Sequence, residues 1–257
     1  MALLVAIVLG TILLALPVAS ADGQRAGTVT ALFTATSAVC VTGLVVVDTA
    51  TYWSGFGEVM ILLLIQAGGL GIMTLATLVV ILLSRRVGLR VRSVVQTETK
   101  AITATDIRRV VRRVVLFSLS VEAVVAGVLT LRFALGYGQA LPQALYSGVF
   151  HAVSAFNNAG FGLHADSLVR YVEDPWVSLT IAAAVIVGGF GFPVWFELAR
   201  TWRRPHQWSV LTRITVYTTV VLLVGGTVFM LAAENSNPDT LGGSTGTTGS
   251  WPHSSPP

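Results

Sequence analysis

A short sequence window occurs twice in this chain, and the repeat constrains the possible folds more than any other feature. The copies run over residues 33–44 and 150–161 at one constant offset. The identical pairs are Phe33 and Phe150, Ala35 and Ala152, Ser37 and Ser154, Ala38 and Ala155, and Gly43 and Gly160. Each copy is a weakly polar run that ends in small residues and one glycine. Such a repeat predicts that one structural unit is built twice along the chain.

The composition of the chain indicates a membrane protein. Of its 257 residues, 54% are hydrophobic and 11% are charged, and the mean hydropathy is +0.77. Soluble domains carry about 25% charged residues, so an ordinary soluble enzyme is excluded. The single cysteine, Cys40, excludes a disulfide framework and a cysteine-based metal site. The chain therefore reads as a polytopic, all-α membrane protein.

Several apolar runs approach or exceed the length of about 20 residues that a bilayer requires. They are Leu3–Ala19, Val59–Leu83, Val114–Leu135, Trp176–Leu198 and Ile214–Ala233. Residues 28–39 and 144–156, which overlap the two windows, lie between these runs and are too short to cross. We expect both to be re-entrant pore helices. The irregular backbone after each must then be buried in protein or line a water-filled cavity.

The basic residues predict how the chain is oriented. Most of the lysines and arginines fall between Ser84 and Arg113 and in the loop after the fourth apolar run. The positive-inside rule places these loops and the N-terminus in the cytoplasm, so that both windows enter from outside a multi-pass plasma-membrane protein. One basic cluster is suited to docking a cytosolic regulator or anionic lipid, with a plain topology signal as the alternative. It consists of Arg85, Arg86, Arg90 and Arg92.

The end of each window has the residues expected of an ion-selectivity filter. A pore that dehydrates a cation needs oxygen ligands, and backbone carbonyls at the end of a pore helix supply them. Glycine and small residues permit the backbone conformation that this requires. The candidate filter residues are Cys40, Val41, Thr42 and Gly43 in the first window and Asn157, Asn158, Ala159 and Gly160 in the second. We expect the Thr42 hydroxyl and the asparagine amides to brace these loops.

A glycine cluster follows each window within a long apolar run. The clusters consist of Gly68, Gly69 and Gly71 in the first half and Gly188, Gly189 and Gly191 in the second. Small residues let apolar helices approach closely. We expect these glycines to serve helix packing near the pore, so that each helix bends and abuts the filter of its own unit. Direct contact with the ion is the alternative.

Two polar features within the apolar regions have competing interpretations. Glu122 lies in the middle of an apolar run, where an ionisable residue is a candidate functional site. The alternative is a carboxyl that is neutral or is paired with a polar group on a neighbouring helix. His151 and Ser154 could suggest a base and a nucleophile, but Ser154 does not lie in a Gly-x-Ser-x-Gly elbow. We therefore do not expect an enzyme.

These segments predict repeated helix–pore loop–helix units, two complete and a third begun. The boundaries are residues 1–84 for the first unit, 85–113 for a basic cytoplasmic loop, 114–198 for the second unit, 199–213 for another basic cytoplasmic loop, 214–242 for the start of a third unit and 243–257 for a low-complexity tail. The tail is rich in Gly, Ser, Thr and Pro, a composition typical of disorder. No third window follows the third outgoing helix, so we expect a C-terminally truncated chain.

Four stretches of the chain together resemble the TrkH/KtrB family of potassium uptake proteins. They are residues 36–44, 65–73, 154–161 and 188–193. The resemblance implies four units around one pseudo-fourfold pore, as in ion channels, with one filter glycine in each unit. Here these would be Gly43 and Gly160, and glycine at the first position implies potassium selectivity. The resemblance also implies a homodimer and a cytosolic nucleotide-binding regulator of the RCK type, similar to KtrA or TrkA. It implies no directly bound cofactor and no nucleic-acid partner.

The sequence therefore predicts a pore-forming membrane subunit of a potassium uptake system. The filter residues would be the only residues of the chain that bind K⁺. Whether transport is coupled to Na⁺ or protons is left as an alternative. The alternative is a non-conducting fragment or scaffold that co-assembles with full-length subunits, because two filter loops cannot encircle an ion. A further alternative is that two copies of the chain together complete a ring of four pore windows.

Overall fold

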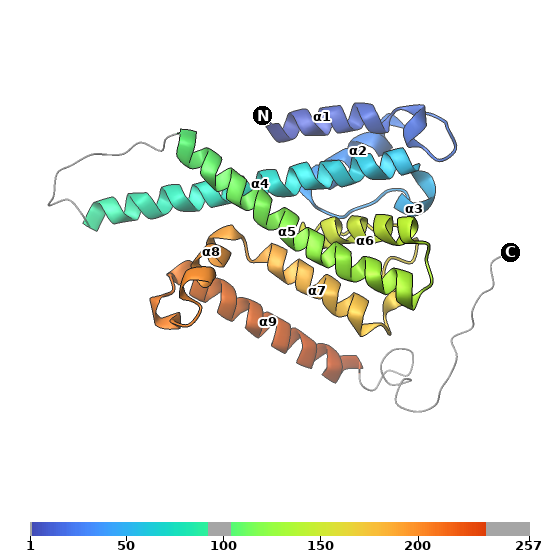
Figure 1. The fold of residues 1–257 in the computed structure, drawn as a ribbon. Coiled ribbons are helices and arrows are strands. Elements are labelled where there is room, and N and C mark those ends of the chain that lie inside the picture. Colours follow the sequence, from blue (N-terminus) through green and yellow to red (C-terminus); the bar gives the residue numbers. More distant parts are fainter. Residues whose placement is uncertain (1, 92–103, 235–257) are drawn as a thin grey trace. The chain divides into compact units, whose positions relative to one another are not determined.

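The computed structural model describes residues 2–91 and 104–234, with side chains described at residues 3–79 and 108–233 (Figure 1). Within these ranges the regular elements are helices, apart from one isolated β-bridge between Ser20 and Trp53. The chain divides into two compact units between Pro193 and Val194. The predicted all-α class is confirmed.

The helices of the first unit include the two windows and two of the long apolar segments. They are α1 (Ala2–Leu14), η1 (Pro17–Ala19), α2 (Thr28–Cys40), α3 (Thr49–Tyr52), α4 (Gly55–Val91), α5 (Ala104–Gly136), α6 (Leu141–Phe156), η2 (Val169–Tyr171) and α7 (Pro175–Gly189). The chain then continues through α8 (Phe192–Thr201), η3 (Pro205–Gln207) and α9 (Val210–Glu234).

Among the described residues, three helical segments are long and apolar enough to cross a membrane by themselves. They are Gly55–Val79 of α4, Arg108–Gly136 of α5 and Val210–Ala233 of α9. Helices α7 and α8 meet the same criterion only as a pair. The chain is therefore an all-α membrane protein.

The apolar run Trp176–Leu198, expected as one helix, forms two. Helix α7 ends at Gly189, Gly191 has a φ of 75°, and Pro193 is the second residue of α8. Proline has no amide hydrogen and clashes inside a helix, but the first turn tolerates it. In the first repeat the glycine cluster is followed by Ile72 and Met73 instead, and α4 continues without a break. The proline thus makes the two glycine clusters structurally different.

The first apolar run, expected to be helical over Leu3–Ala19, also contains a shorter helix than predicted. Helix α1 ends at Leu14 after 13 residues, and Pro17 begins the short helix η1. Leu16 is extended, with φ −69° and ψ 144°, as expected of a residue before proline. Helix α1 is therefore shorter than the roughly 20 residues that a crossing requires.

The two windows form short helices in matching surroundings. Helix α2 has 13 residues and α6 has 16, both below the length of a membrane crossing. Helix α2 packs against α1 and α4, and α6 packs against α5 and α7. Each window helix thus contacts one apolar helix that precedes it and one that follows it in the chain. In Figure 1, α6 lies beside α5 over much of its length.

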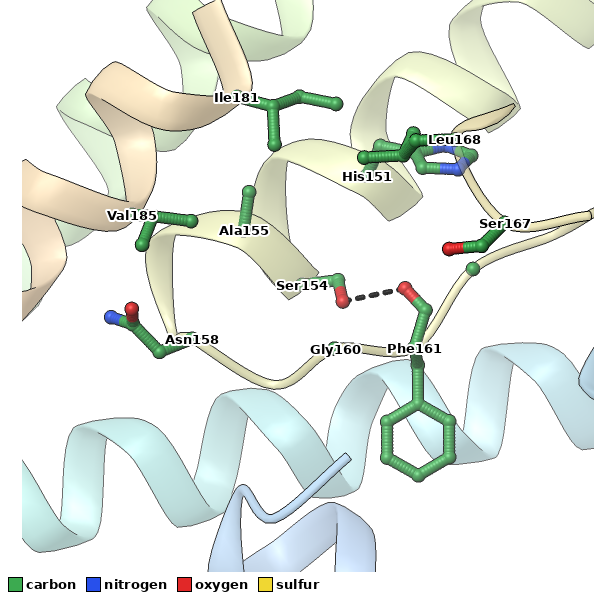
Figure 2. A pocket seen from close by; sticks show the side chains of 11 residues that line it. His151, Ser154, Ala155, Asn158, Gly160, Phe161, Ser167, Leu168, Ile181 and Val185 are labelled. Carbon is green, nitrogen blue, oxygen red and sulfur yellow. Dashed lines mark hydrogen bonds between the residues drawn. The ribbon is translucent and has the colours of Figure 1, made fainter. Parts of the chain in front are cut away.

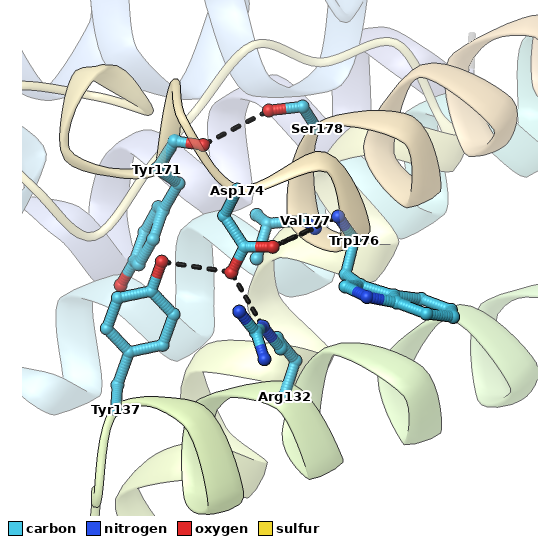
Figure 3. A network of polar contacts seen from close by, with 7 residues as sticks. All are labelled: Arg132, Tyr137, Tyr171, Asp174, Trp176, Val177 and Ser178. Carbon is cyan, nitrogen blue, oxygen red and sulfur yellow. Dashed lines mark hydrogen bonds and ion pairs between the residues drawn. The ribbon is translucent and has the colours of Figure 1, made fainter.

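A polar cluster joins the end of α5 to the start of α7 (Figure 3). Arg132 Nε lies 2.7 Å from Asp174 Oδ2, and the Tyr137 hydroxyl donates to the same oxygen at 3.0 Å. The other oxygen of Asp174 caps α7 by accepting from the amides of Trp176 and Val177. Burial opposes ionisation of Asp174, but these donors outweigh it and hold the pKa of its carboxyl below the ordinary value.

The second unit contains a polar contact that fixes the start of α9. Glu197 accepts hydrogen bonds from the amide and the hydroxyl of Ser209 and from the hydroxyl of Thr212. The hydroxyl of Ser209 in turn accepts from the Thr212 amide at 3.3 Å, as expected of an N-terminal cap. The Glu197 carboxylate of α8 therefore ties that helix to the start of α9.

Candidate functional site

The chain leaves α2 and α6 with the same backbone conformation. After α2, Val41 and Gly43 have φ values of 57° and 71°. After α6, Asn158 and Gly160 have φ values of 58° and 74°. These pairs are related by the offset that relates the two sequence windows. Positive φ is strained for most residues but readily adopted by glycine, so Gly43 and Gly160 suit their positions.

The backbone hydrogen bonds after the two helices also match. The Thr42 amide donates to the Ser37 carbonyl at 3.0 Å, and the Ala159 amide donates to the Ser154 carbonyl at 2.7 Å. These bonds resemble the left-handed endings by which many helices satisfy their last carbonyls. The sequence repeat is therefore also a repeat of local structure.

The two loops meet at their glycines. A Cβ atom built on Gly43 would lie 2.7 Å from the Ala159 carbonyl oxygen and 3.3 Å from Gly160 Cα. A Cβ atom built on Gly160 would lie 3.3 Å from Gly43 Cα. The structure thus brings Gly43 and Gly160 together, although they are far apart in sequence. Both are candidate filter residues of the sequence analysis.

The first glycine of each cluster lies against the end of a window helix. A Cβ atom on Gly68 would lie 2.0 Å from the Val39 carbonyl oxygen, and one on Gly188 would lie 1.8 Å from the Phe156 carbonyl oxygen. Val39 and Phe156 occupy aligned positions in the repeat. Any side chain at Gly68 or Gly188 would therefore have to displace backbone.

The other cluster glycines have different surroundings. A Cβ atom on Gly69 would lie 1.9 Å from Asn157 Oδ1, so the absence of a side chain there makes room for the asparagine. A Cβ atom on Gly71 would lie 3.4 Å from Leu3 Cδ2, and one on Gly189 would meet nothing within 4 Å. Gly191 lies at the break between α7 and α8.

A buried polar network holds the second candidate filter loop to the first repeat. Gln66 Nε2 of α4 donates to both oxygens of Glu122 in α5, at 3.1 and 3.0 Å. Asn157 Nδ2 lies 3.1 Å from Gln66 Oε1, 3.3 Å from Glu122 Oε1 and 2.9 Å from the Val153 carbonyl oxygen. Glu122 and Asn157 are almost fully buried. A buried carboxyl needs such partners, and the ones found here are amides.

This network includes a residue that the sequence did not single out. Glu122 was expected either to be functional or to pair with a neighbouring helix, and its partners prove to be Gln66 and Asn157. The signal for Gln66 was the presence of one amide in an otherwise apolar run. A second contact between the repeats was also missed, since the Tyr146 hydroxyl of α6 donates to Glu58 of α4 at 2.5 Å.

The first window has no counterpart of this network at the aligned position. Cys40, which aligns with Asn157, is exposed at the end of α2. The Thr42 hydroxyl instead donates to the Ser37 hydroxyl at 3.0 Å, within the window itself. In the second window, Asn158 Nδ2 lies 3.4 Å from the Phe156 carbonyl oxygen. The two candidate filter loops are thus alike in backbone but supported differently.

His151 and Ser154 both line a cavity beside the second loop, but they are not hydrogen-bonded to each other (Figure 2). The Ser154 hydroxyl donates to the Phe161 carbonyl at 2.6 Å, and His151 Nδ1 lies 2.8 Å from the Ser147 carbonyl oxygen. Each side chain therefore supports backbone, and the pair lacks the contact that a base and its nucleophile require.

The basic cluster cannot be placed in this geometry. The side chains of Arg85, Arg86 and Arg90 and the whole of Arg92 lie outside the described residues. The tail 243–257 and the last part of the third unit lie outside them as well.

This fold and site define a class of protein, namely a multi-pass, all-α membrane protein with two matching helix-and-loop windows. The chain belongs to the TrkH family of cation transport proteins, which matches residues 2–242. The resemblance inferred from the sequence motifs is confirmed.

Three relatives illustrate the similarity. The Ktr system potassium uptake protein B of Bacillus subtilis is 41% identical over 92% of this chain and 52% of its own length. The protein of the same name from Vibrio alginolyticus is 39% identical over 93% of this chain and 52% of its own length. The potassium/sodium uptake protein NtpJ of Enterococcus hirae is 32% identical over 90% and 50%, respectively. The chain spans about half the length of the curated relatives it matches.

Proposed function

We propose that this chain forms part of the pore of a potassium uptake protein in the plasma membrane. The relatives named as potassium uptake proteins support potassium as the transported ion. In this proposal α2 and α6 are re-entrant pore helices that enter from outside, and the N-terminus is cytoplasmic. The positive-inside distribution of basic residues supports that orientation.

The proposed filter consists of residues 40–43 and 157–160, whose carbonyl oxygens replace the hydration shell of K⁺. The observation that carries this proposal is the meeting, at Gly43 and Gly160, of two loops that have positive φ at the same aligned positions. The C-terminal ends of α2 and α6 adjoin these loops, and the partial negative charge of a helix C-terminus favours a cation. No directly bound cofactor is needed for this function.

Selectivity, driving force and regulation are parts of the same proposal. Glycine at position 43 favours K⁺, while the potassium/sodium uptake protein among the relatives leaves a role for Na⁺. The membrane potential can drive uptake, at about 2.3 kcal/mol per charge per 100 mV. A homodimer and a cytosolic RCK-type regulator, docked on the basic cluster that begins at Arg85, complete the proposed assembly.

A second candidate function is a non-conducting subunit or scaffold that co-assembles with further pore windows. The observation that favours it is that, among the described residues, two loops meet at the glycines. A dehydrated ion needs oxygen ligands on all sides. The two candidates therefore differ in whether this chain conducts by itself.

Complementation distinguishes the two candidates. The chain is expressed in a bacterium that lacks its own potassium uptake systems, and growth is measured at low external potassium. Rescue that is lost in Gly43→Ser and Gly160→Ser but kept in Gly138→Ser supports the pore. Gly138 is a matched control because it has a φ of 64° and no atom within 4 Å of its Cβ position.

A chain that inserts into the membrane without rescuing growth supports the scaffold. Co-expression with a full-length relative then tests co-assembly, which is measured by pull-down from detergent. Loss of growth rescue in all three glycine variants alike contradicts a specific role for the two loops.

A further inference from the structure

A cavity of about 300 Å³ lies beside the loop that follows α6 (Figure 2). Side chains of α6 form one wall, including His151 and Ser154, and Ile181 and Val185 of α7 form another. Residues 160–162 of the loop close a third side. The cavity therefore adjoins the second candidate filter loop.

His151 brings an unsatisfied polar atom to this cavity. Its Nδ1 lies 2.8 Å from the Ser147 carbonyl oxygen, which can only accept, so Nδ1 carries a proton. Its Nε2 is buried and has no hydrogen-bond partner among the described residues. The His151 side chain is only 4% exposed, so bulk solvent does not satisfy this nitrogen.

The orientation of the ring is fixed by its neighbours. It stacks on His164, with ring centroids 5.7 Å apart and planes at 26°. The rings of Phe133 and Phe150 pack against it at centroid distances of 6.3 and 6.1 Å. Rotation of the ring to find another partner would disturb these contacts and the bond to Ser147.

The loop on the other side of the cavity also has unsatisfied polar groups. Within the described residues, the amides of Gly160, Phe161 and Gly162 donate to no protein atom. A Cβ atom built on Gly162 would lie 3.8 Å from His151 Nε2, so this part of the loop approaches the ring closely. Phe161 is buried, Gly162 is half-buried and Gly160 is exposed. A buried backbone amide is almost always paired with protein or with ordered water, so the Phe161 amide needs such a partner.

We propose that the cavity binds ordered water, which bridges His151 Nε2 to the backbone of residues 160–162. A water molecule occupies about 30 Å³ and requires two to four polar partners, and the cavity provides both the space and the partners. Water can donate to a neutral Nε2 and accept from a protonated one, so it suits either state of the ring. The aligned residue of the first window is Thr34, so this site belongs to the second window.

The bound water braces the second loop from the side of α7, while Asn157 braces it through α4 and α5. The water site itself does not depend on the proposed transport function. Its consequence for ion selectivity does rest on that function. The test therefore measures water directly and does not use transport as its readout.

X-ray radiolytic labelling of the purified full chain tests the proposal. Brief irradiation converts bound water into hydroxyl radicals that label adjacent side chains, and mixing with ¹⁸O water distinguishes slowly exchanging water from bulk. We expect Leu168, whose side chain lines the cavity (Figure 2), to acquire label with retained ¹⁶O. Phe156, which is 2% exposed, is the buried control and should stay unlabelled. Tyr137, which is 42% exposed, should carry label from bulk water.

Three variants connect the label to His151. His151→Leu removes the acceptor and should abolish slow labelling of Leu168, whereas His151→Gln keeps an acceptor and should retain slow labelling. Thr34→Val is the matched control in the first window and should leave the labelling of Leu168 unchanged. Should His151→Leu fail to fold, wild-type labelling and the glutamine variant still decide. Absence of slow label at Leu168 in the wild type, or its persistence in a folded His151→Leu, overturns the proposal.

Discussion

The carbonyl oxygen of Val39 occupies the space that a side chain on Gly68 would need. A Cβ atom on Gly68 would lie 2.0 Å from it, and the pair formed by Gly188 and Phe156 repeats this relationship at 1.8 Å. Both contacts join a long helix to the penultimate or last residue of a window helix. They hold the backbone from which the candidate filter loops begin.

Gly68→Ala and Gly188→Ala are therefore expected to destabilise the fold by about 1–3 kcal/mol each, because backbone must move to admit the methyl group. The free energy of unfolding in mixed detergent micelles measures this. Gly189→Ala is the control, since nothing lies within 4 Å of its Cβ position and alanine favours a helix. Equal stability of all three variants would contradict the packing role.

Replacing Gly43 should cost more than its backbone conformation alone explains. Gly43→Ala introduces left-handed strain of about 1–2 kcal/mol and, in addition, a contact of 2.7 Å with the Ala159 carbonyl oxygen. Gly138→Ala has similar strain, with φ 64°, but no neighbour within 4 Å. The difference between their unfolding free energies isolates the contact between the two loops. No difference would mean that the loops do not touch.

The pH dependence of stability should reveal the carboxyl that caps α7. The pKa of Asp174 is lowered by folding, so its stabilisation is complete above the unfolded value of about 3.9 and disappears as pH falls through the folded value. Asp174→Asn should cost about 1–2 kcal/mol at pH 7, because Arg132, Tyr137 and two amides lose a charged acceptor. The cost should shrink below pH 4. Glu173→Gln, at an exposed neighbouring position, is the control for removing one negative charge next to the cap.

The repeat made the two windows predictable from sequence, but not their supports. Constant spacing identified the ends of α2 and α6, because short weakly polar runs between long apolar ones have few alternatives. The break at Gly191 was missed, although Pro193 provides a local signal that a helix cannot continue. The length of the apolar run Trp176–Leu198 instead favoured a single membrane-spanning helix.

Contacts between distant segments were beyond the reach of local patterns. The glycines of the two clusters cannot be distinguished by sequence. A Cβ atom on Gly68 would nonetheless contact the Val39 carbonyl oxygen, whereas one on Gly189 would contact nothing within 4 Å. The rotation of each helix about its axis decides which of its glycines face a neighbour. The partners of Glu122 come from two other helices. The sequence predicts that a carboxyl in an apolar run, such as that of Glu122, needs polar partners. Only the packing of α4, α5 and α6 identifies these partners.

The network around Glu122 should behave as one energetic unit. Because Gln66 and Asn157 are hydrogen-bonded to each other and both reach Glu122, Gln66→Ala and Asn157→Ala should be non-additive, with a coupling of about 0.5–3 kcal/mol. A double-mutant cycle in mixed micelles measures it. The control cycle pairs Gln66→Ala with Asp174→Ala, which share no partner and should be additive within about 0.5 kcal/mol. Additivity in the first cycle would show that α4 does not support the second candidate filter loop through these amides.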